Sequence, residues 1–301
     1  MINRIGTRTG FDALMGLNQQ TLSRTYDLQI QISSGLKSQN YSGISGVAGR
    51  LVNFEGANTR LNQYLSDITV TRNRLKLAET QVDSVRELAN QFRSDLLNAL
   101  NAENDQFQPT AEIAKQFMDQ MENLLNVKDG DQYIFSGSRS DVAPVNLRAF
   151  STPVNVGTSN TEYYQGDDYE AFSRVGEGRT VTYGMTANDP TFEKLIRAMR
   201  NVFNNPNDNG KLRASLDLVE EVAQKDIPAM ISGIGVKVAQ LDRIEGIHEQ
   251  NILILTNTIS EMKDTNIIDA SAKLSQENNT LQASFIALSK IGNLSLANYI
   301  N

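Results

Sequence analysis

The strongest constraint in this sequence is a run of apolar residues repeated every seven positions between residues 54 and 99. Every seventh residue from Phe54 is apolar, and the residue three positions after each is apolar or aromatic, except for Thr71. A repeat sustained over so many turns predicts one long helix that packs along a seam, as helices do in coiled coils. The main positions of this rod seam are Phe54, Leu61, Ile68, Leu75, Val82, Val85, Phe92 and Leu96.

Weaker helical patterns flank the rod seam. Apolar residues recur at heptad positions over 231–262, although Pro228 and two nearby glycines lower the helix propensity at the start of this segment. Apolar residues in 212–223 predict a preceding helical stretch, and a shorter helix is expected to begin near Pro109 and to end near Gly130. The chain is therefore expected to form two helical arms.

Between these arms, from about residue 133 to residue 184, the composition changes. Short β-forming runs at 133–135, 163–164, 172–175 and 180–183 alternate with turns rich in Gly and Asp. Runs of this length bounded by turn residues predict short strands. We interpret the segment as a small β-rich insert.

Each end of the chain carries an apolar stripe with no obvious partner face. Thr21 and Thr25 interrupt the N-terminal stripe. Ordering one residue costs on the order of 1–2 kcal/mol of backbone entropy, which a lone stripe does not offset. Both ends are therefore expected to gain order by packing against each other and against neighbouring copies. The expected assembly interface comprises Leu14, Leu17, Leu28, Ile32, Leu36, Leu274, Leu281, Phe285, Leu288, Ile291 and Leu296.

Charge and composition exclude several classes of protein. The formal net charge is -7 with no block of Lys and Arg, which argues against nucleic acid as a partner. The absence of Cys excludes disulfides and thiol chemistry. No apolar run approaches the roughly 20 residues of a membrane span, and the first ten residues lack the apolar core of a cleaved signal peptide. We expect no membrane insertion, and either a cytosolic location or export without a cleaved signal.

The residues that could carry chemistry have simpler structural interpretations. His248 is the only histidine, and it falls in a polar layer of the second heptad pattern. The run 205–210 resembles a calcium loop but has Leu216 where a bidentate Glu is required. The Gly-rich run 176–179 lacks a third Gly and precedes no expected helix, and no nucleophile motif is present. We expect no catalytic, metal or cofactor site.

Several motifs, in order along the chain, resemble those of bacterial flagellins and their relatives. Gln31–Lys37 (QISSGLK) resembles the segment near the start of flagellins, and Arg86–Gln91 (RELANQ) resembles the motif on their first long helix. Residues 264–300 resemble the terminal helix of the family. The ending LSLANYIN, Tyr133–Gly137 (YIFSG) and Tyr164–Asp167 (YQGD) are more similar to the hook-associated branch than to filament flagellins. The loop 38–49 departs from the family pattern, because Gly and Ser replace its acidic and Ala-rich residues.

This resemblance implies a mainly α-helical fold with a β-rich insert. The terminal helices would pair as a coiled coil, long helices would form a rod domain, and a small β domain would lie outside. The implied boundaries are 1–40 plus 265–301 for the terminal assembly domain, 41–132 plus 188–264 for the helical rod, and 133–187 for the outer β domain.

The resemblance also implies a structural role in the bacterial flagellum. The chain would form a ring of copies at the hook–filament junction, as an adaptor between a first hook-associated protein and flagellin that filament assembly and motility require. It would leave the cell through the flagellar export channel, and an export chaperone would hold Leu274–Leu296. Two alternatives remain open: a filament flagellin present in thousands of copies, and a cytosolic coiled-coil scaffold that forms a stable dimer. An enzyme acting through the β-rich insert is a weaker alternative, since no convergent polar pocket is evident there.

Overall fold

The structure, a computed structural model, describes residues 2–101, 109–148 and 155–300, with side chains from Thr9 to Lys290 within these ranges. It is mainly helical, with a small antiparallel β region. The helices are α1 (Ile2–Ser34), α2 (Ser45–Asn101), α3 (Thr110–Leu125), α4 (Pro190–Asn204), α5 (Asn209–Glu221), α6 (Ile227–Lys263) and α7 (Ile267–Ile300). A 3₁₀ turn, η1 (Tyr41–Ile44), precedes α2, and a π-helical turn, η2 (Val222–Asp226), joins α5 to α6.

Contacts between Cα atoms group the chain into two compact units. Unit 1 comprises residues 1–59 and 251–301, and unit 2 comprises residues 60–250. The boundary falls inside the long helices α2 and α6. The division into assembly, rod and outer β domains stays a prediction.

Two hairpins make up the β region of unit 2. Strand β1 (Lys128–Asp129) pairs with β2 (Gln132–Tyr133), and β3 (Phe172–Gly176) pairs with β4 (Arg179–Thr182). The second hairpin matches two of the β-forming runs, and its turn contains Gly178 at a φ of 67°, a conformation that favours glycine. The run at 163–164 forms only an isolated bridge, between Val145 and Tyr164.

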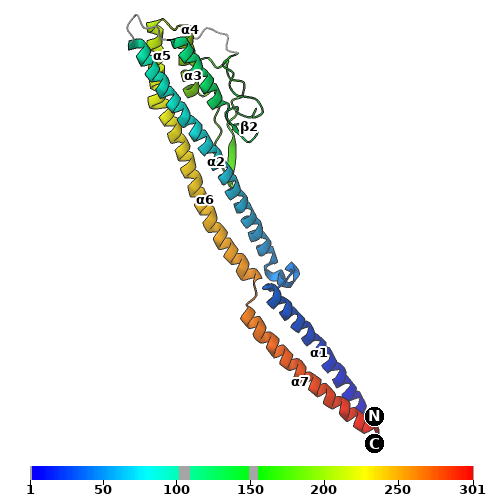
Figure 1. The fold of residues 1–301 in the computed structure, drawn as a ribbon. Helices are drawn as coiled ribbons and strands as arrows, with labels where there is room; N and C mark the ends of the chain where they lie inside the picture. Colours follow the sequence, from blue (N-terminus) through cyan, green and yellow to red (C-terminus); the bar gives the residue numbers. More distant parts are fainter. Residues whose placement is uncertain (1, 102–108, 149–154, 301) are drawn as a thin grey trace. The chain divides into compact units, whose positions relative to one another are not determined.

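The core of unit 2 lies among α2, α3, α4, α5 and α6 (Figure 1). Phe92 of α2 packs on Phe117 of α3 with ring centroids 5.1 Å apart, and Phe135 meets Phe192 of α4 edge-on at 5.7 Å. Helix α4 was not among the helices expected individually. Its N-terminal signal is nevertheless present, because the Asp189 carboxylate accepts a hydrogen bond from the Thr191 amide and Pro190 occupies the first turn.

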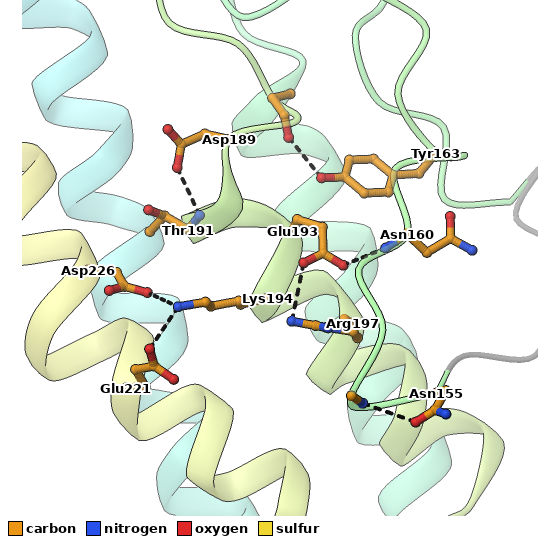
Figure 2. Close-up of polar contacts among 12 residues, drawn as sticks. Asn155, Asn160, Tyr163, Asp189, Thr191, Glu193, Lys194, Arg197, Glu221 and Asp226 are labelled. Atoms are coloured by element: carbon orange, nitrogen blue, oxygen red, sulfur yellow. Dashed lines mark hydrogen bonds and ion pairs between the residues drawn. The ribbon is translucent and has the colours of Figure 1, made fainter.

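A buried polar network fastens the insert to α4 (Figure 2). Glu193 and Arg197 form an ion pair at 3.3 Å, with side chains only 3% and 10% exposed. The second Glu193 oxygen accepts a hydrogen bond from the Asn160 amide at 2.9 Å, and the Tyr163 hydroxyl donates to the Ala187 carbonyl. Burial raises the pKa of Tyr163 far above its ordinary value, so this phenol stays a donor.

The π-helical turn η2 coincides with a change in the spacing of buried residues. Buried positions recur at intervals of seven along α5 and α6, except that Val219 and Ile227 are eight apart: Leu212, Val219, Ile227, Ile234, Leu241 and His248. A π-turn accommodates one extra residue without rotating the rest of the helix out of register. The eight-residue step therefore places one residue in the turn while both helices keep their buried faces inward.

The same turn aligns two carboxylates five residues apart. The π hydrogen bond from the Ile227 amide to the Val222 carbonyl spans five residues. Glu221 and Asp226 consequently point to the same side, where each lies 2.8 Å from Lys194 Nζ of α4 (Figure 2). These hydrogen bonds raise the pKa of Lys194, Asp226 contributing more than Glu221.

Candidate assembly surface of the terminal helices

Helix α1 ends at the Ser-Ser-Gly motif for local chemical reasons. The hydroxyls of Ser33 and Ser34 donate to the Ile30 carbonyl at 3.0 and 2.7 Å, and Gly35 adopts a φ of 73°. These serines satisfy a carbonyl of the last turn, and the left-handed glycine stops the helix, as glycine commonly does at a C-terminus. The motif therefore acts as a helix stop.

Directly after this stop, the chain is tied to the segment between α6 and α7. Leu36 and Asp264 form an isolated antiparallel β-bridge. The Thr265 amide donates to the Gly35 carbonyl at 2.8 Å, and the Lys37 amide donates to the Lys263 carbonyl at 2.7 Å. We call this joint, formed by residues 35–37 and 263–265, the corner of unit 1. It fixes where the two terminal helices begin to run beside each other.

A charged cluster braces the corner. Glu55 of α2 accepts hydrogen bonds from the Tyr41 hydroxyl at 2.7 Å and from Lys263 Nζ at 3.0 Å. Both bonds stabilise the ionised carboxylate, Tyr41 more than Lys263, and so lower the pKa of Glu55. The same contacts raise the pKa of Tyr41 and of Lys263.

Helices α1 and α7 lie side by side beyond the corner (Figure 1). Their buried and half-buried residues alternate at steps of three and four, the spacing of a heptad seam. On α1 these terminal seam residues are Leu14, Asn18, Thr21, Thr25, Leu28 and Ile32. On α7 they are Ala270, Leu274, Glu277, Leu281, Ser284 and Leu288.

The middle of the terminal seam is polar. Thr21 and Thr25, which interrupt the apolar stripe in the sequence, are 4% and 6% exposed. Their hydroxyls donate to the carbonyls of Leu17 and Thr21, four residues earlier. The buried amide nitrogen of Asn18 makes no hydrogen bond within the described residues. Polar side chains therefore replace apolar area in the middle of this helix pair.

An ion pair links the two helices. Arg24 Nε lies 2.8 Å from Glu277 Oε1, and Arg24 Nη2 donates to Glu277 Oε2 at 3.2 Å. This two-point contact raises the pKa of Arg24. Its paired geometry favours a single axial alignment.

A second apolar face of unit 1 is exposed. On α1 it comprises Phe11, Met15, Leu22, Tyr26 and Ile30. On α7 it comprises Ile267, Ile268, Phe285 and Ile286. Tyr26 is 63% exposed and Ile268 is 83% exposed. We call these residues the outer apolar face. Large exposed apolar surfaces of this kind mark sites of association.

The residues predicted for the assembly interface do not share one face. Leu281 and Leu288 are buried in the terminal seam, and Leu17 and Phe285 are exposed. The side chains of Ile291 and Leu296 lie outside the described residues. Half-buried positions among the predicted residues are Leu14, Leu28, Ile32, Leu36 and Leu274. The sequence prediction missed most of the outer apolar face, although the helical spacing of Phe11, Met15, Leu22, Tyr26 and Ile30 was a usable signal.

The rod-seam positions on α2 differ in burial. Those from Ile68 to Leu96 are buried, whereas Phe54 and Leu61 are half-buried. His248 of α6 also lies in this region, 8% exposed, with its ring 5.7 Å from that of Tyr64. Its Nε2 lies 2.7 Å from the Val175 carbonyl, so it holds the β3–β4 hairpin against the helices.

Two motifs of the insert, distant in sequence, meet in space. Asp167 of the YQGD motif accepts hydrogen bonds from the amide and hydroxyl of Ser138, which follows the YIFSG motif. A side chain at Gly137 or at Gly166 would collide with backbone atoms of the opposite motif, so both positions need glycine. The Ser138 bonds lower the pKa of Asp167, and burial raises the pKa of Tyr164 to about 12.

Two kinds of feature are absent from the described residues. Among these residues, His248, the aspartates and the glutamates form no group of three or more that could hold a metal ion. No helix among them combines the length and the apolar character of a membrane span.

Comparison with known proteins identifies the fold. Neither the protein-family models nor the curated proteins give a match to the sequence. Solved structures do match, and one is assigned as a flagellar hook-associated protein of Vibrio parahaemolyticus. That match has a TM-score of 0.61 and 23% identity, and it covers 74% of this chain and 100% of that one. The chain has the fold of flagellar hook-associated proteins.

Two structures from Legionella pneumophila extend the likeness. Flagellar hook-associated protein 3 matches with a TM-score of 0.57 and 13% identity, over 69% of this chain and 98% of that one. The flagellar junction protein FlgL matches with a TM-score of 0.51 and 14% identity, over 71% of this chain and 99% of that one. The likeness therefore spans nearly the whole of each solved chain.

Proposed function

We propose that this chain is a non-enzymatic structural subunit of the bacterial flagellum that forms the hook–filament junction. The observation that carries the proposal is the fold shared with hook-associated protein 3 and the junction protein FlgL. In this role it is an adaptor between a first hook-associated protein and flagellin. Filament assembly and motility depend on it.

The proposal includes partners and a route. Copies of the chain form a ring, contact the first hook-associated protein on the hook side, and contact flagellin on the filament side. The chain reaches the cell exterior through the flagellar export channel without a cleaved signal, and an export chaperone holds residues 274–296. Within the subunit, the helical rod provides stiffness and the β-rich insert forms the outer domain.

The two faces of the terminal helices have different roles in assembly. The terminal seam pairs α1 with α7 as a coiled coil, and its heptad spacing supports this. The outer apolar face contacts neighbouring subunits, because it is an apolar surface that the pairing leaves exposed. The polar centre of the seam makes the pair marginal in a free monomer, and burial against neighbours supplies the missing stabilisation.

A deletion scored by electron microscopy tests the function. Cells lacking the chain are expected to carry hooks without filaments and to shed flagellin into the medium. Antibody labelling of the complemented strain is expected to mark a single band next to the hook. Normal filaments in the deletion strain would refute the proposal, and label along the whole filament would indicate a flagellin.

Three substitutions on α7 test how the two faces divide the work. Phe285→Asp, on the outer apolar face, is expected to block incorporation while the purified monomer keeps the hydrogen exchange of the wild-type α1–α7 pair. Leu281→Asp is expected to speed exchange in that pair as well, because Leu281 is 7% exposed in the seam. Gln276→Asp adds the same charge on the opposite side of α7, nine residues from Phe285, and is the matched control. Normal incorporation of Phe285→Asp would contradict the assignment of this face.

A further inference from the structure

Unit 2 contains a small cavity that the proposed function does not use. Its volume is about 140 Å³, and it lies between helix α2, the β1–β2 hairpin and the chain on either side of the β3–β4 hairpin. An apolar cavity of about 150 Å³ holds benzene. A ring that carries hydroxyl groups is larger, so it would enter this cavity only in part.

Aromatic side chains form much of the cavity wall. Tyr133, Tyr169 and Tyr183 come from three separate segments and line the same space. Lys128 Nζ lies 4.5 Å from the centre of the Tyr133 ring, and the Arg74 guanidinium lies 5.7 Å from that of Tyr183. These cation–π contacts hold two of the rings in place. Tyr169 is 49% exposed.

Polar groups line the remainder of the cavity, and they include donors and acceptors. Arg74 Nε lies 3.2 Å from Asp129 Oδ2, Arg74 Nη1 donates to the Tyr183 hydroxyl at 2.9 Å, and Arg74 Nη2 donates to Gln132 Oε1 at 3.2 Å. Nη1 and Nη2 of Arg74 each carry a second N–H, and the Gln132 amide nitrogen and the Ser140 hydroxyl can also donate hydrogen bonds. The Asp129 carboxylate and Ser140 supply acceptors.

The charges of the lining residues compensate each other. Arg74 and Asp129 neutralise one another through their ion pair. A charged ligand would bind one member of this ion pair and leave the other member without its counter-charge. An apolar ligand would satisfy none of the polar groups. The lining is suited to a neutral ring with apolar faces and a hydroxylated edge.

We propose that this cavity binds one ring of a neutral carbohydrate. The sugar ring stacks its apolar C–H face on the tyrosines, while its hydroxyls bond to Arg74, Asp129 and Gln132. Pockets that combine aromatic walls with a few placed polar groups recognise ligands in this way. The inference does not depend on the proposed function.

Saturation-transfer NMR on the full chain tests the proposal. The probes are methyl β-D-glucopyranoside, methyl β-D-galactopyranoside and N-acetylglucosamine, with phenol as an apolar comparator and sialic acid as a charged one. For a ligand of about 13 non-hydrogen atoms, ordinary ligand efficiency gives a Kd of about 1 mM. At least one neutral sugar is expected to bind in this range.

Two substitutions locate the binding. Tyr169→Ala is expected to weaken sugar binding about tenfold, because it removes one stacking wall. Phe172→Ala removes a nearby ring that is 56% exposed and does not line the cavity, and it is expected to leave binding unchanged. Both side chains are exposed, so neither change threatens the fold. The proposal is overturned if no neutral sugar binds up to tens of millimolar, if phenol or sialic acid binds best, or if Tyr169→Ala binds sugar as the unsubstituted chain does.

Discussion

The π-helical turn offers a sharp test of how the sequence sets the register of α6. Two features lie at this turn: the eight-residue step from Val219 to Ile227, and Pro228, whose ring clashes with the carbonyl four residues earlier in a regular α-helix. If spacing is the main cause, Pro228→Ala by itself is expected to leave the π-turn in place. The step of eight residues is unchanged in that variant.

Deleting Lys225 separates the two causes. Lys225 is exposed within the turn, and its removal restores seven-residue spacing across the junction. In the Pro228→Ala background this deletion is expected to give a continuous α-helix with every buried residue still facing inward. The loss is limited to part of the Lys194 ion-pair cluster, which is worth about 1 kcal/mol or less. With Pro228 present, the same deletion leaves proline inside a regular helix and costs about 3 kcal/mol.

The matched control deletes Val236, an exposed α6 residue, in the same Pro228→Ala background. This deletion rotates every later residue of α6 by about 100° relative to the residues before it. Leu241 and Ile244, which are buried, then leave the core, at about 1.5–3 kcal/mol each. The expected loss is about 3–6 kcal/mol.

Urea unfolding followed by circular dichroism at 222 nm measures the loss of unfolding free energy caused by each deletion. Hydrogen exchange over residues 227–248 shows whether the helix is intact there. The spacing argument predicts a difference of at least about 2 kcal/mol between the two deletions. Equal destabilisation by the Lys225 and Val236 deletions would refute it. Loss of the π-turn in Pro228→Ala alone would assign the turn to proline instead.

Three further predictions concern single residues. Because hydrogen bonds from Tyr41 and Lys263 lower the pKa of Glu55, its stabilising contribution is complete above about pH 4.5 and is lost as the pH falls through the lowered folded value; the protection factors of amides at the corner, which correct for slower intrinsic exchange at low pH, should therefore fall on acidification in the native chain and much less in Glu55→Gln. Phe92→Ala should destabilise unit 2 by about 3–5 kcal/mol in urea unfolding, because Phe92 is completely buried and the change leaves a cavity. Asn18→Leu should slow amide exchange in the α1–α7 pair, because it replaces a buried amide nitrogen that lacks a partner among the described residues with apolar area; faster exchange would show that the polar seam stabilises the pair.

The long helices and the second hairpin were predictable because their signals are local. The heptad repeat of α2 gives its buried face directly, and the glycines at 176–178 give the turn between β3 and β4. Helix α4 could have been found from its Asp-Pro start. It was not predicted as a separate helix, because the predicted β-rich insert ends at residue 187, directly before the helix begins.

The candidate site was less accessible to sequence reasoning. An apolar stripe predicts a buried face, but it does not say which partner covers it. Leu281 and Phe285 lie four residues apart on α7, and yet one is buried against α1 and the other is exposed. Thr21 and Thr25 interrupt the apolar pattern in the sequence, and yet both are among the most buried residues of α1.

By itself, the sequence determined the helical character of the chain and the place of the β region. Each of these follows from spacing or from the backbone preference of a few neighbouring residues. Only the tertiary structure decided the polar terminal seam, the meeting of Gly137 with Asp167 and the tyrosine-lined cavity. These features depend on which distant segments pack together, because burial and hydrogen-bond partners are properties of the assembled fold.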